Sequence, residues 1–277
     1  AININKGSDA AWLNKGIALA QLQQHRQAIT AFNQALKLNG ELEEAWNNRG
    51  NSFYSLNQFD KALESFDRAL ELRKDYDEAL FNKGATLGRL GRLDDAISIF
   101  DKVLDTKNDA FKKRPEFVKA WVARGMAFYQ LKKLEEALKC FDEALKINPR
   151  DPDVWNIRGN IAADQGKLEE ALEYYTRGIK SDPKVESLWN NRGNMLARLK
   201  RHSDALVSFE QAIAIKPDYA VAWVNKAISL QQLGKPAEGL EAAERALLLN
   251  NQVADGWDLK GQFLDLLDRP QEALTAF

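Results

Sequence analysis

The sequence predicts an all-α solenoid of about eight helix-turn-helix repeats. The first observation is that the seven tryptophans recur every 34 residues, apart from one longer interval. They are Trp12, Trp46, Trp121, Trp155, Trp189, Trp223 and Trp257. The longer interval, from Trp46 to Trp121, is 75 residues, so it holds two repeat lengths and seven extra residues, and Leu80 replaces the missing tryptophan. A fixed period of this length is typical of stacked repeats that bury a shared core.

Three further positions keep the same period. We count them from the tryptophan, or Leu80, as the zero position of each repeat. Position +4 is glycine with one alanine, position +16 is alanine with one glycine, and position +20 is aromatic with one alanine. In the second repeat these residues are Gly50, Ala62 and Phe66. A mid-helix glycine costs about 1 kcal/mol relative to alanine, so its recurrence indicates close packing of two helices.

Each repeat contains two amphipathic segments, which we call helix A and helix B. In the second repeat, apolar or small residues recur at helical spacing over 45–53 and again over 60–70. Asn39-Gly40, Asn148-Pro149 and Asp182-Pro183 end helix B. The whole chain, 1–277, is therefore expected to form one solenoid domain with an insertion at 111–117 and the tail of a preceding repeat at 1–8. The repeats are placed at 9–42, 43–76, 77–110, 118–151, 152–185, 186–219, 220–253 and 254–277, the last one truncated.

This combination of positions resembles the tetratricopeptide repeat (TPR) family, whose pattern is W…LG…Y…A…F…P. The resemblance extends over nearly the whole chain. It implies a right-handed α-α superhelix whose A helices line a concave groove that binds extended peptides. Because both ends fall inside a repeat, we expect a fragment of a longer TPR protein and end-to-end self-association through the truncated repeats.

Composition argues against several classes of partner. The net charge is −1, with 39 Lys and Arg against 40 Asp and Glu, so no global field favours nucleic acid or an anionic membrane surface. No stretch approaches the ~20 apolar residues that membrane insertion requires. The single cysteine, Cys140, permits no disulfide framework, which favours a reducing, cytoplasmic compartment.

The residues needed for catalysis are sparse. The two histidines, His25 and His202, occupy the same position five repeats apart, and neither they nor Cys140 form a zinc-binding or nucleophile–base pattern. We therefore expect no enzymatic activity, no metal and no cofactor in this segment.

A basic residue precedes position +4 in every repeat. It could form a stripe for an acidic ligand, or a structural ladder with acids that follow the aromatic of helix B; we favour the ladder. The bases are Lys15, Arg49, Lys83, Arg124, Arg158, Arg192, Lys226 and Lys260, and the acids are Asp67, Asp101, Asp142, Glu210 and Glu244.

Asparagine is concentrated at the positions of helix A that would face the groove, about −2, +1, +2, +5, +8 and +9. A primary amide can pair with the N–H and C=O of an extended peptide whatever its side chains; alternatively, these amides bond adjacent helices. Tyr54, Phe81, Met126 and Tyr129 are candidates for apolar pockets, and Asp164 and Arg198 for a charge preference. The predicted peptide-binding residues are Asn47, Asn48, Asn51, Tyr54, Asn82, Tyr129, Asn156, Asn160, Asn190, Asn191, Asn194, Arg198 and Asn225.

Two irregularities have structural and functional interpretations. The insertion 111–117 is either a basic docking loop or hinge, or a tolerated connection, which we favour. The seventh repeat has Ala227, Gly239 and Ala243 at positions +4, +16 and +20, and Pro236 at the start of helix B. Because a buried aromatic is lost there, we expect this repeat to be the loosest.

The sequence thus predicts a protein–protein interaction module, a scaffold or adaptor that binds an extended peptide or protein segment in its groove. Two alternatives stay open. The segment could be the substrate-targeting arm of a larger enzyme, such as a glycosyltransferase or kinase, with its catalytic domain outside these residues. It could also be an architectural scaffold whose groove is empty.

Overall fold

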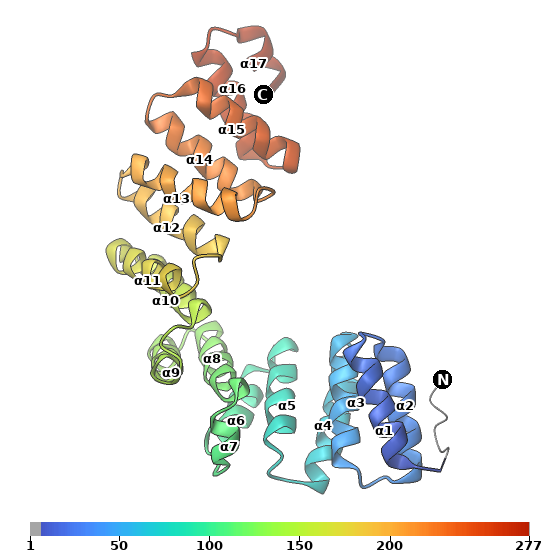
Figure 1. The fold of residues 1–277 in the computed structure, drawn as a ribbon. Coiled ribbons are helices and arrows are strands. Elements are labelled where there is room, and N and C mark those ends of the chain that lie inside the picture. Colours follow the sequence, from blue (N-terminus) through green and yellow to red (C-terminus); the bar gives the residue numbers. More distant parts are fainter. Residues whose placement is uncertain (1–6, 277) are drawn as a thin grey trace. The chain divides into compact units, whose positions relative to one another are not determined.

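The computed structural model describes residues 7–276, which form α-helices joined by short turns, with no strand among them (Figure 1). The A helices are α1 (Asp9–Gln21), α3 (Glu43–Ser55), α5 (Asp77–Arg89), α8 (Pro115–Gln130), α10 (Pro152–Asp164), α12 (Glu186–Arg198), α14 (Ala220–Gln232) and α16 (Ala254–Leu266). The B helices are α2 (His25–Leu38), α4 (Phe59–Leu72), α6 (Leu93–Leu104), α9 (Leu134–Ile147), α11 (Leu168–Ser181), α13 (His202–Ile215), α15 (Pro236–Leu249) and α17 (Pro270–Ala276). The all-α repeat fold predicted from the sequence is confirmed. The predicted repeat tail at 1–8 falls mostly, and Phe277 entirely, outside the described residues.

The helices group into two compact units, Ala1–Asn148 and Pro149–Phe277, which we call the N-terminal and C-terminal units. Within each unit, helix A packs on helix B of its own repeat and on helix B of the preceding repeat. Neighbouring A helices also touch, in the pairs α1–α3, α3–α5, α5–α8, α12–α14 and α14–α16. We use the name A-helix face for the exposed side chains of the A helices in each unit, α1, α3, α5 and α8 in the N-terminal unit and α10, α12, α14 and α16 in the C-terminal unit.

The glycine at position +4 lets the aromatic ring of helix B approach helix A. A Cβ atom placed on Gly16 would lie 2.4 Å from the Phe32 ring, and one on Gly50 would lie 2.5 Å from Phe66. These distances are too short for any side chain, so the ring occupies the space that a Cβ would need. Phe32 and Phe66 are fully buried as a result.

The tryptophan at the zero position has a polar role as well as a packing role. In five repeats its indole Nε1–H donates a hydrogen bond to the carbonyl six residues earlier, in the turn that precedes helix A. The acceptors are Gly40 for Trp46 (2.8 Å), Pro149 for Trp155 (3.0 Å), Pro183 for Trp189 (2.9 Å), Pro217 for Trp223 (3.0 Å) and Asn251 for Trp257 (2.9 Å). The bond ties the turn between repeats to the helix that follows it.

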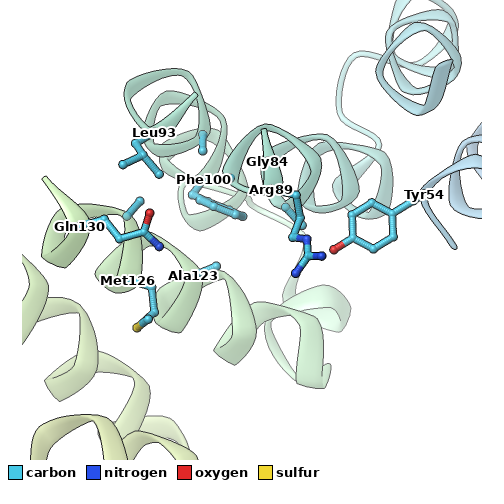
Figure 2. Close-up of a pocket in the computed structure, with 12 residues that line it drawn as sticks. Tyr54, Gly84, Arg89, Leu93, Phe100, Ala123, Met126 and Gln130 are labelled. Atoms are coloured by element: carbon cyan, nitrogen blue, oxygen red, sulfur yellow. The ribbon is translucent and has the colours of Figure 1, made fainter. Parts of the chain in front are cut away.

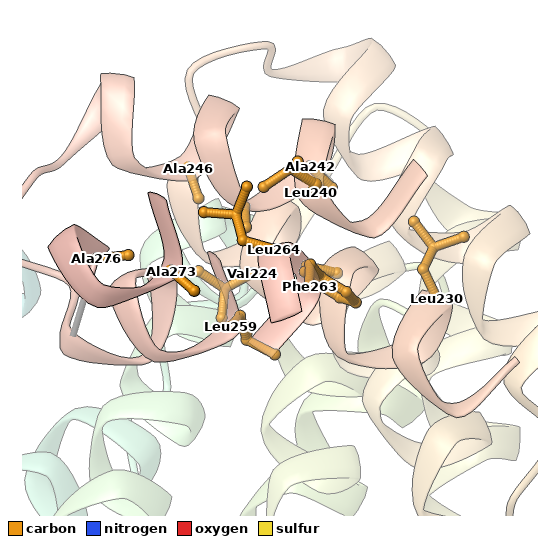
Figure 3. Packing of buried hydrophobic residues seen from close by; sticks show 12 residues of the cluster. Val224, Leu230, Leu240, Ala242, Ala246, Leu259, Phe263, Leu264, Ala273 and Ala276 are labelled. Carbon is orange, nitrogen blue, oxygen red and sulfur yellow. The ribbon is translucent and has the colours of Figure 1, made fainter. Parts of the chain in front are cut away.

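The seventh repeat is packed by a ring from the eighth. Phe263 of α16 is fully buried, and a Cβ placed on Gly239 would lie 2.4 Å from it. Ala227 and Ala243, also fully buried, belong to the same apolar cluster (Figure 3). The gap expected from the missing aromatic is therefore filled, so the prediction of a loose seventh repeat loses its physical reason.

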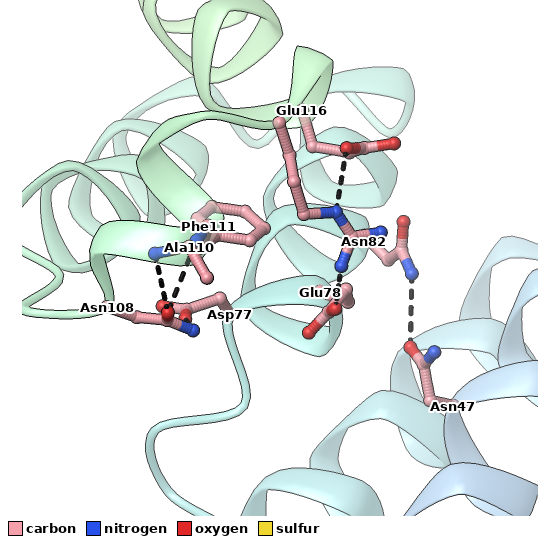
Figure 4. A network of polar contacts seen from close by, with 9 residues as sticks. Asn47, Asp77, Glu78, Asn82, Asn108, Ala110, Phe111 and Glu116 are labelled. Carbon is pink, nitrogen blue, oxygen red and sulfur yellow. Dashed lines mark hydrogen bonds and ion pairs between the residues drawn. The ribbon is translucent and has the colours of Figure 1, made fainter.

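The insertion is folded rather than a loose loop. It contributes the one-turn helix α7 (Asp109–Lys112), and Phe111 is 1% exposed, with its ring centroid 6.3 Å from that of Phe117. The Asn108 side chain accepts the Ala110 and Phe111 N–H groups at 3.1 and 3.2 Å (Figure 4). Arg114 pairs with Glu78 and, at 3.3 Å, with Glu116. These contacts support the structural interpretation of the insertion over a docking loop.

We expect the packing of Phe263 on Gly239 to appear as strong coupling between the two positions. Phe263→Ala should cost α15 and α16 about 3–5 kcal/mol of local stability, because it leaves a cavity against Gly239. Gly239→Ala should destabilise the parent chain, because the new Cβ would meet the ring. The same change should cost little once Phe263 is alanine, since the other repeats have alanine at position +16.

Amide hydrogen exchange in α15 and α16 measures these effects. Leu266→Ala is the control, because Leu266 lies on the same helix and is 65% exposed. Equal costs of Gly239→Ala in the two backgrounds would show that the ring does not depend on the glycine.

Candidate functional site

A chain of asparagine amides joins three A helices of the C-terminal unit. Asn191 on α12 donates to Asn156 on α10 at 3.0 Å, and Asn225 on α14 donates to Asn190 on α12 at 2.9 Å. Asn190 in turn donates to Asn191 at 3.5 Å. Asn190 is only 3% exposed, so its amide is committed mainly to this chain. These four asparagines, at positions +1 and +2, therefore bond adjacent helices, as the alternative interpretation holds.

Asparagines one helical turn further, at position +5, are placed differently. Asn160 is exposed; its side-chain oxygen accepts the Tyr175 hydroxyl at 2.8 Å and an Asn191 N–H at 3.4 Å. Its amide nitrogen donates no hydrogen bond within the described residues. Asn194, on the next A helix, is half-exposed, and its side chain has no hydrogen-bond partner there. These two amides retain hydrogen-bonding capacity toward a ligand.

Tyr175 holds the Asn160 amide in place. It stands at position +20, where six other repeats have phenylalanine, and it is 2% exposed. The pKa of Tyr175 is raised to about 12, mainly by burial; the Asp164 carboxylate contributes to the rise, and Arg198 opposes it. The phenol is therefore neutral at ordinary pH and donates its proton to Asn160. Sequence reasoning missed this residue, although it is the only tyrosine in the aromatic row.

The N-terminal unit shows the same division between inner and outer amides. Asn47 is 5% exposed and accepts a hydrogen bond from Asn82 at 3.0 Å (Figure 4). Asn48 and Asn51 are half-exposed, and their side chains have no hydrogen-bond partner in the described part of the chain. Arg198, the predicted charged residue of the C-terminal unit, is exposed in the last turn of α12.

A pocket of about 230 Å³ opens on the N-terminal unit (Figure 2). Tyr54 and Met126, both predicted to line an apolar pocket, do line it, whereas Phe81 and Tyr129 do not. The space exists because α5 has Gly88 at position +8, where the neighbouring repeats have Tyr54 and Tyr129. A Cβ placed on Gly88 would meet no atom within 4 Å. Leu93, Phe100 and Gln130 also line the pocket, and so does Arg89, which sequence reasoning missed.

Seven of the eight basic residues that precede position +4 form an ion pair or a hydrogen bond with a B helix. Four of them form ion pairs with an acid on helix B of the preceding repeat: Lys83–Asp67 at 2.5 Å, Arg124–Asp101 at 2.7 Å, Lys226–Glu210 at 3.1 Å and Lys260–Glu244 at 3.0 Å. Three others donate to a hydroxyl on helix B of their own repeat: Arg49 to Ser65, Arg158 to Tyr174 and Arg192 to Ser208. The ladder interpretation is confirmed, with hydroxyls in place of acids in part of it.

Six of the eight bases also lie over the tryptophan ring of their own repeat. Arg49 lies 4.2 Å from the ring centroid of Trp46, and Lys226 lies 5.6 Å from that of Trp223. A cation on the face of an indole is attracted by the negative potential of the ring. Arg49, Arg124, Arg192, Lys226 and Lys260 therefore each link the zero position of their repeat to a B helix.

The other polar features of the described residues are structural. Cys140 is fully buried, burial raises the pKa of its thiol, and Arg124 donates to its sulfur at 3.2 Å. Over residues 7–276, no three His, Cys, Asp or Glu side chains are grouped as metal ligands would be. None of the helices described is long and apolar enough to cross a membrane.

Comparison with solved structures gives matches of the same fold. The crystal structure of the APC/C hetero-tetramer Cut9–Hcn1 matches 92% of this chain and 49% of that chain, at a TM-score of 0.64 and 15% identity. This chain thus spans about half the length of that match. The crystal structure of YrrB, described as a TPR protein with an unusual peptide-binding site, matches 69% of this chain and 95% of that chain, at a TM-score of 0.51 and 26% identity. No curated protein sequence is significantly similar to the chain.

Family models, all described as tetratricopeptide repeat, match successive parts of the sequence. One matches residues 10–42, 43–76 and 118–151, and another matches 77–109. Two more match 140–173 and 157–220. The matches cover well over half of the chain, and they agree with the spacing of the tryptophans and with the paired helices of the structure. The chain belongs to the tetratricopeptide repeat family.

Proposed function

We propose that this chain, a protein–protein interaction scaffold, binds an extended segment of a partner polypeptide across the A-helix face of its C-terminal unit. The observation that carries the proposal is the pair of outward amides, Asn160 and Asn194, beside an inner chain of amides that bonds the helices together. Binding, rather than catalysis, is the role that this arrangement of side chains supports.

The spacing of the A helices suits an extended ligand. Packed helices lie about 8–10 Å apart, and an extended chain advances about 3.3 Å per residue. Asn160 on α10 and Asn194 on α12 would therefore meet the ligand backbone at about every third residue. Each hydrogen bond contributes on the order of 1 kcal/mol, so the expected affinity is modest and tolerant of ligand sequence.

The neighbours of Asn160 determine what it offers the ligand. Because the neutral Tyr175 hydroxyl donates to the Asn160 oxygen, the amide nitrogen is the group left for a ligand carbonyl. Arg198, exposed on α12, adds a positive charge that favours an acidic residue in the bound segment. The site thus combines a fixed backbone contact with one charge preference.

The pocket of the N-terminal unit supplies a second kind of contact. Tyr54, Met126 and Phe100 give it apolar walls, and Arg89 is an exposed cation beside it. An apolar side chain of a partner would fill this space, with an acidic neighbour favoured by Arg89. The likeness to YrrB, a TPR protein with a peptide-binding site, supports a peptide as the ligand class.

Peptide binding at the A-helix face of the C-terminal unit is tested with the double variant Asn160→Ala, Asn194→Ala. Peptides selected from a random display library on the parent chain are measured against the variant by isothermal titration calorimetry. Loss of two backbone contacts should weaken binding by at least about tenfold. The control is Asn251→Ala, which removes an exposed asparagine in the turn between α15 and α16. Unchanged binding to the double variant would place the site elsewhere.

Tyr175→Phe removes the hydroxyl that orients the Asn160 amide but leaves Asn160 itself in place. We expect weaker peptide binding than in the parent, by less than in the double variant, because Asn160 is retained but no longer held. In the parent, one tyrosine should titrate near pH 12 by ultraviolet absorbance, and this transition should vanish in Tyr175→Phe. Its absence in the parent would contradict the burial of the phenol.

Because the pKa of Tyr175 is raised in the folded chain, the free energy of unfolding depends on pH. The folded chain holds this proton more tightly than the unfolded chain, whose tyrosines titrate near pH ~10. The stabilisation is therefore complete below pH ~10 and is lost as the pH rises through the folded pKa of about 12. Denaturant titrations in this window should show a smaller loss for Tyr175→Phe than for the parent.

Gly88→Leu closes the pocket of the N-terminal unit without strain, because nothing lies within 4 Å of its Cβ position. Replacing this helical glycine with leucine, a good helix former, should raise the free energy of unfolding by up to about 1 kcal/mol. Peptides whose selection depends on an apolar anchor should lose binding to Gly88→Leu, while Gly88→Ala, which leaves most of the space open, should retain it. Equal binding to both variants would exclude the pocket as an anchor site.

A further inference from the structure

The third repeat lacks the tryptophan that the other repeats have at the zero position. In five of the repeats that have the tryptophan, its Nε1–H donates to the carbonyl six residues earlier, as Trp46 does to Gly40 at 2.8 Å and Trp189 to Pro183 at 2.9 Å. Cations accompany the ring: Arg49 lies 4.2 Å from the Trp46 centroid, and Arg177 lies 5.1 Å from that of Trp155. An indole site in this chain is thus a carbonyl acceptor, an apolar wall and flanking cations.

A pocket of about 580 Å³ lies at the corresponding place in the third repeat. Leu80, which stands at the zero position, is one wall, and Lys74, six residues before it, is another. Lys102, at the position that Arg177 has relative to Trp155, lines it too. The Lys74 carbonyl accepts no hydrogen bond within the described residues. The pocket therefore holds the elements of an indole site without the indole.

The end of helix B keeps this space open. Helix α6 has 12 residues, whereas α4 and α9 have 14. The chain after Leu104 leaves the helix early and leads into α7, so Asp105 and Asn108 line the pocket. Asn108 is fixed there by its hydrogen bond to Asp77 at 2.8 Å (Figure 4). The surrounding backbone is held by these contacts, and the pocket is a built feature of the unit.

We propose that this pocket binds a tryptophan side chain of a partner polypeptide. An aromatic side chain buries about 150–250 Å², and aromatic residues dominate many interfaces. Tryptophan is enriched among the residues that contribute most of the binding energy. The pocket lies in the N-terminal unit, lined by α5, α6 and the turns beside them. This proposal is therefore independent of the site proposed on the A-helix face of the C-terminal unit.

The chemistry of the walls selects the indole. Leu80 is 8% exposed and offers an apolar surface. The Lys74 carbonyl, six residues before the zero position, corresponds to the carbonyls that accept an indole N–H in other repeats. Lys102 supplies a cation for the face of the ring. Leucine or phenylalanine would leave the carbonyl without a donor, whereas the indole has a large apolar ring and one N–H.

The first experiment uses the full chain labelled with ¹⁵N and two small probes, N-acetyl-tryptophanamide and N-acetyl-leucinamide. We expect the tryptophan probe to shift amide resonances of 74–80 and 102–108 in a saturable manner, and the leucine probe to shift neither. Absence of these shifts, or shifts confined to other repeats, would overturn the proposal.

Two matched variants then fill this pocket in the third repeat and open the corresponding space in the second repeat. Leu80→Trp places the chain's own indole in the pocket and should weaken binding of the tryptophan probe by at least about tenfold. Trp46→Leu makes the reverse change in the second repeat and should create a second set of shifts near Gly40. Undiminished binding to Leu80→Trp would overturn the proposal. If circular dichroism shows that either variant is unfolded, Leu80→Phe replaces it, because the phenylalanine fills part of the same space. Probe binding to Leu80→Phe, together with the resonance shifts of the parent chain, then tests the proposal.

The source of the indole is tested with a short capped peptide that contains one tryptophan, its alanine counterpart, and free indole. The tryptophan peptide should bind at least about tenfold more tightly than the alanine peptide and should compete with the tryptophan probe. If free indole binds but the tryptophan peptide does not, the pocket excludes a polypeptide, and the assignment to a partner's side chain is wrong.

Discussion

The rest of the structure depends on the contact between the ring of helix B and the glycine of helix A. In six of the eight repeats, a Cβ on this glycine would fall within 2.8 Å of the ring, as at Gly84 and Phe100. The contact sets the distance between the two helices of a repeat, and that distance places every position of helix A relative to its neighbours. The amide chain, the cation ladder and the pockets are all consequences of helices held at this separation.

The cations form a second layer of contacts, some between neighbouring repeats and some between the two helices of one repeat. Lys83 pairs with Asp67 of the preceding repeat, and Arg192 bonds Ser208 of its own. Exposed ion pairs contribute little individually, about 0–1 kcal/mol, so their effect lies in the geometry they impose. A base that packs on a tryptophan and contacts a B helix limits how one repeat can rotate on the next.

The sequence was sufficient to predict the repeats, their helices and the ladder, because these features recur with the period. It was insufficient for contacts between repeats that occur only once in the chain or depend on the offset between helices. Phe263 fills the space at Gly239 from the next repeat, so an analysis of the seventh repeat alone predicted a gap. Which asparagines bond each other depends on the offset between helices, which spacing within one repeat does not contain. Gly88 was visible in the sequence, but an empty volume beside it depends on Tyr54 and Met126 of two other repeats.

The indole hydrogen bonds have a consequence for how unfolding of this chain is observed. A single tryptophan per repeat, donating to a carbonyl of the turn before it, gives each such repeat its own spectroscopic marker. The side-chain N–H resonances of Trp46, Trp155, Trp189, Trp223 and Trp257 would move when the turn beside each indole opens. A stack of nearly identical units, in which loss of structure is usually seen only as an average, thus reports the order in which its units open.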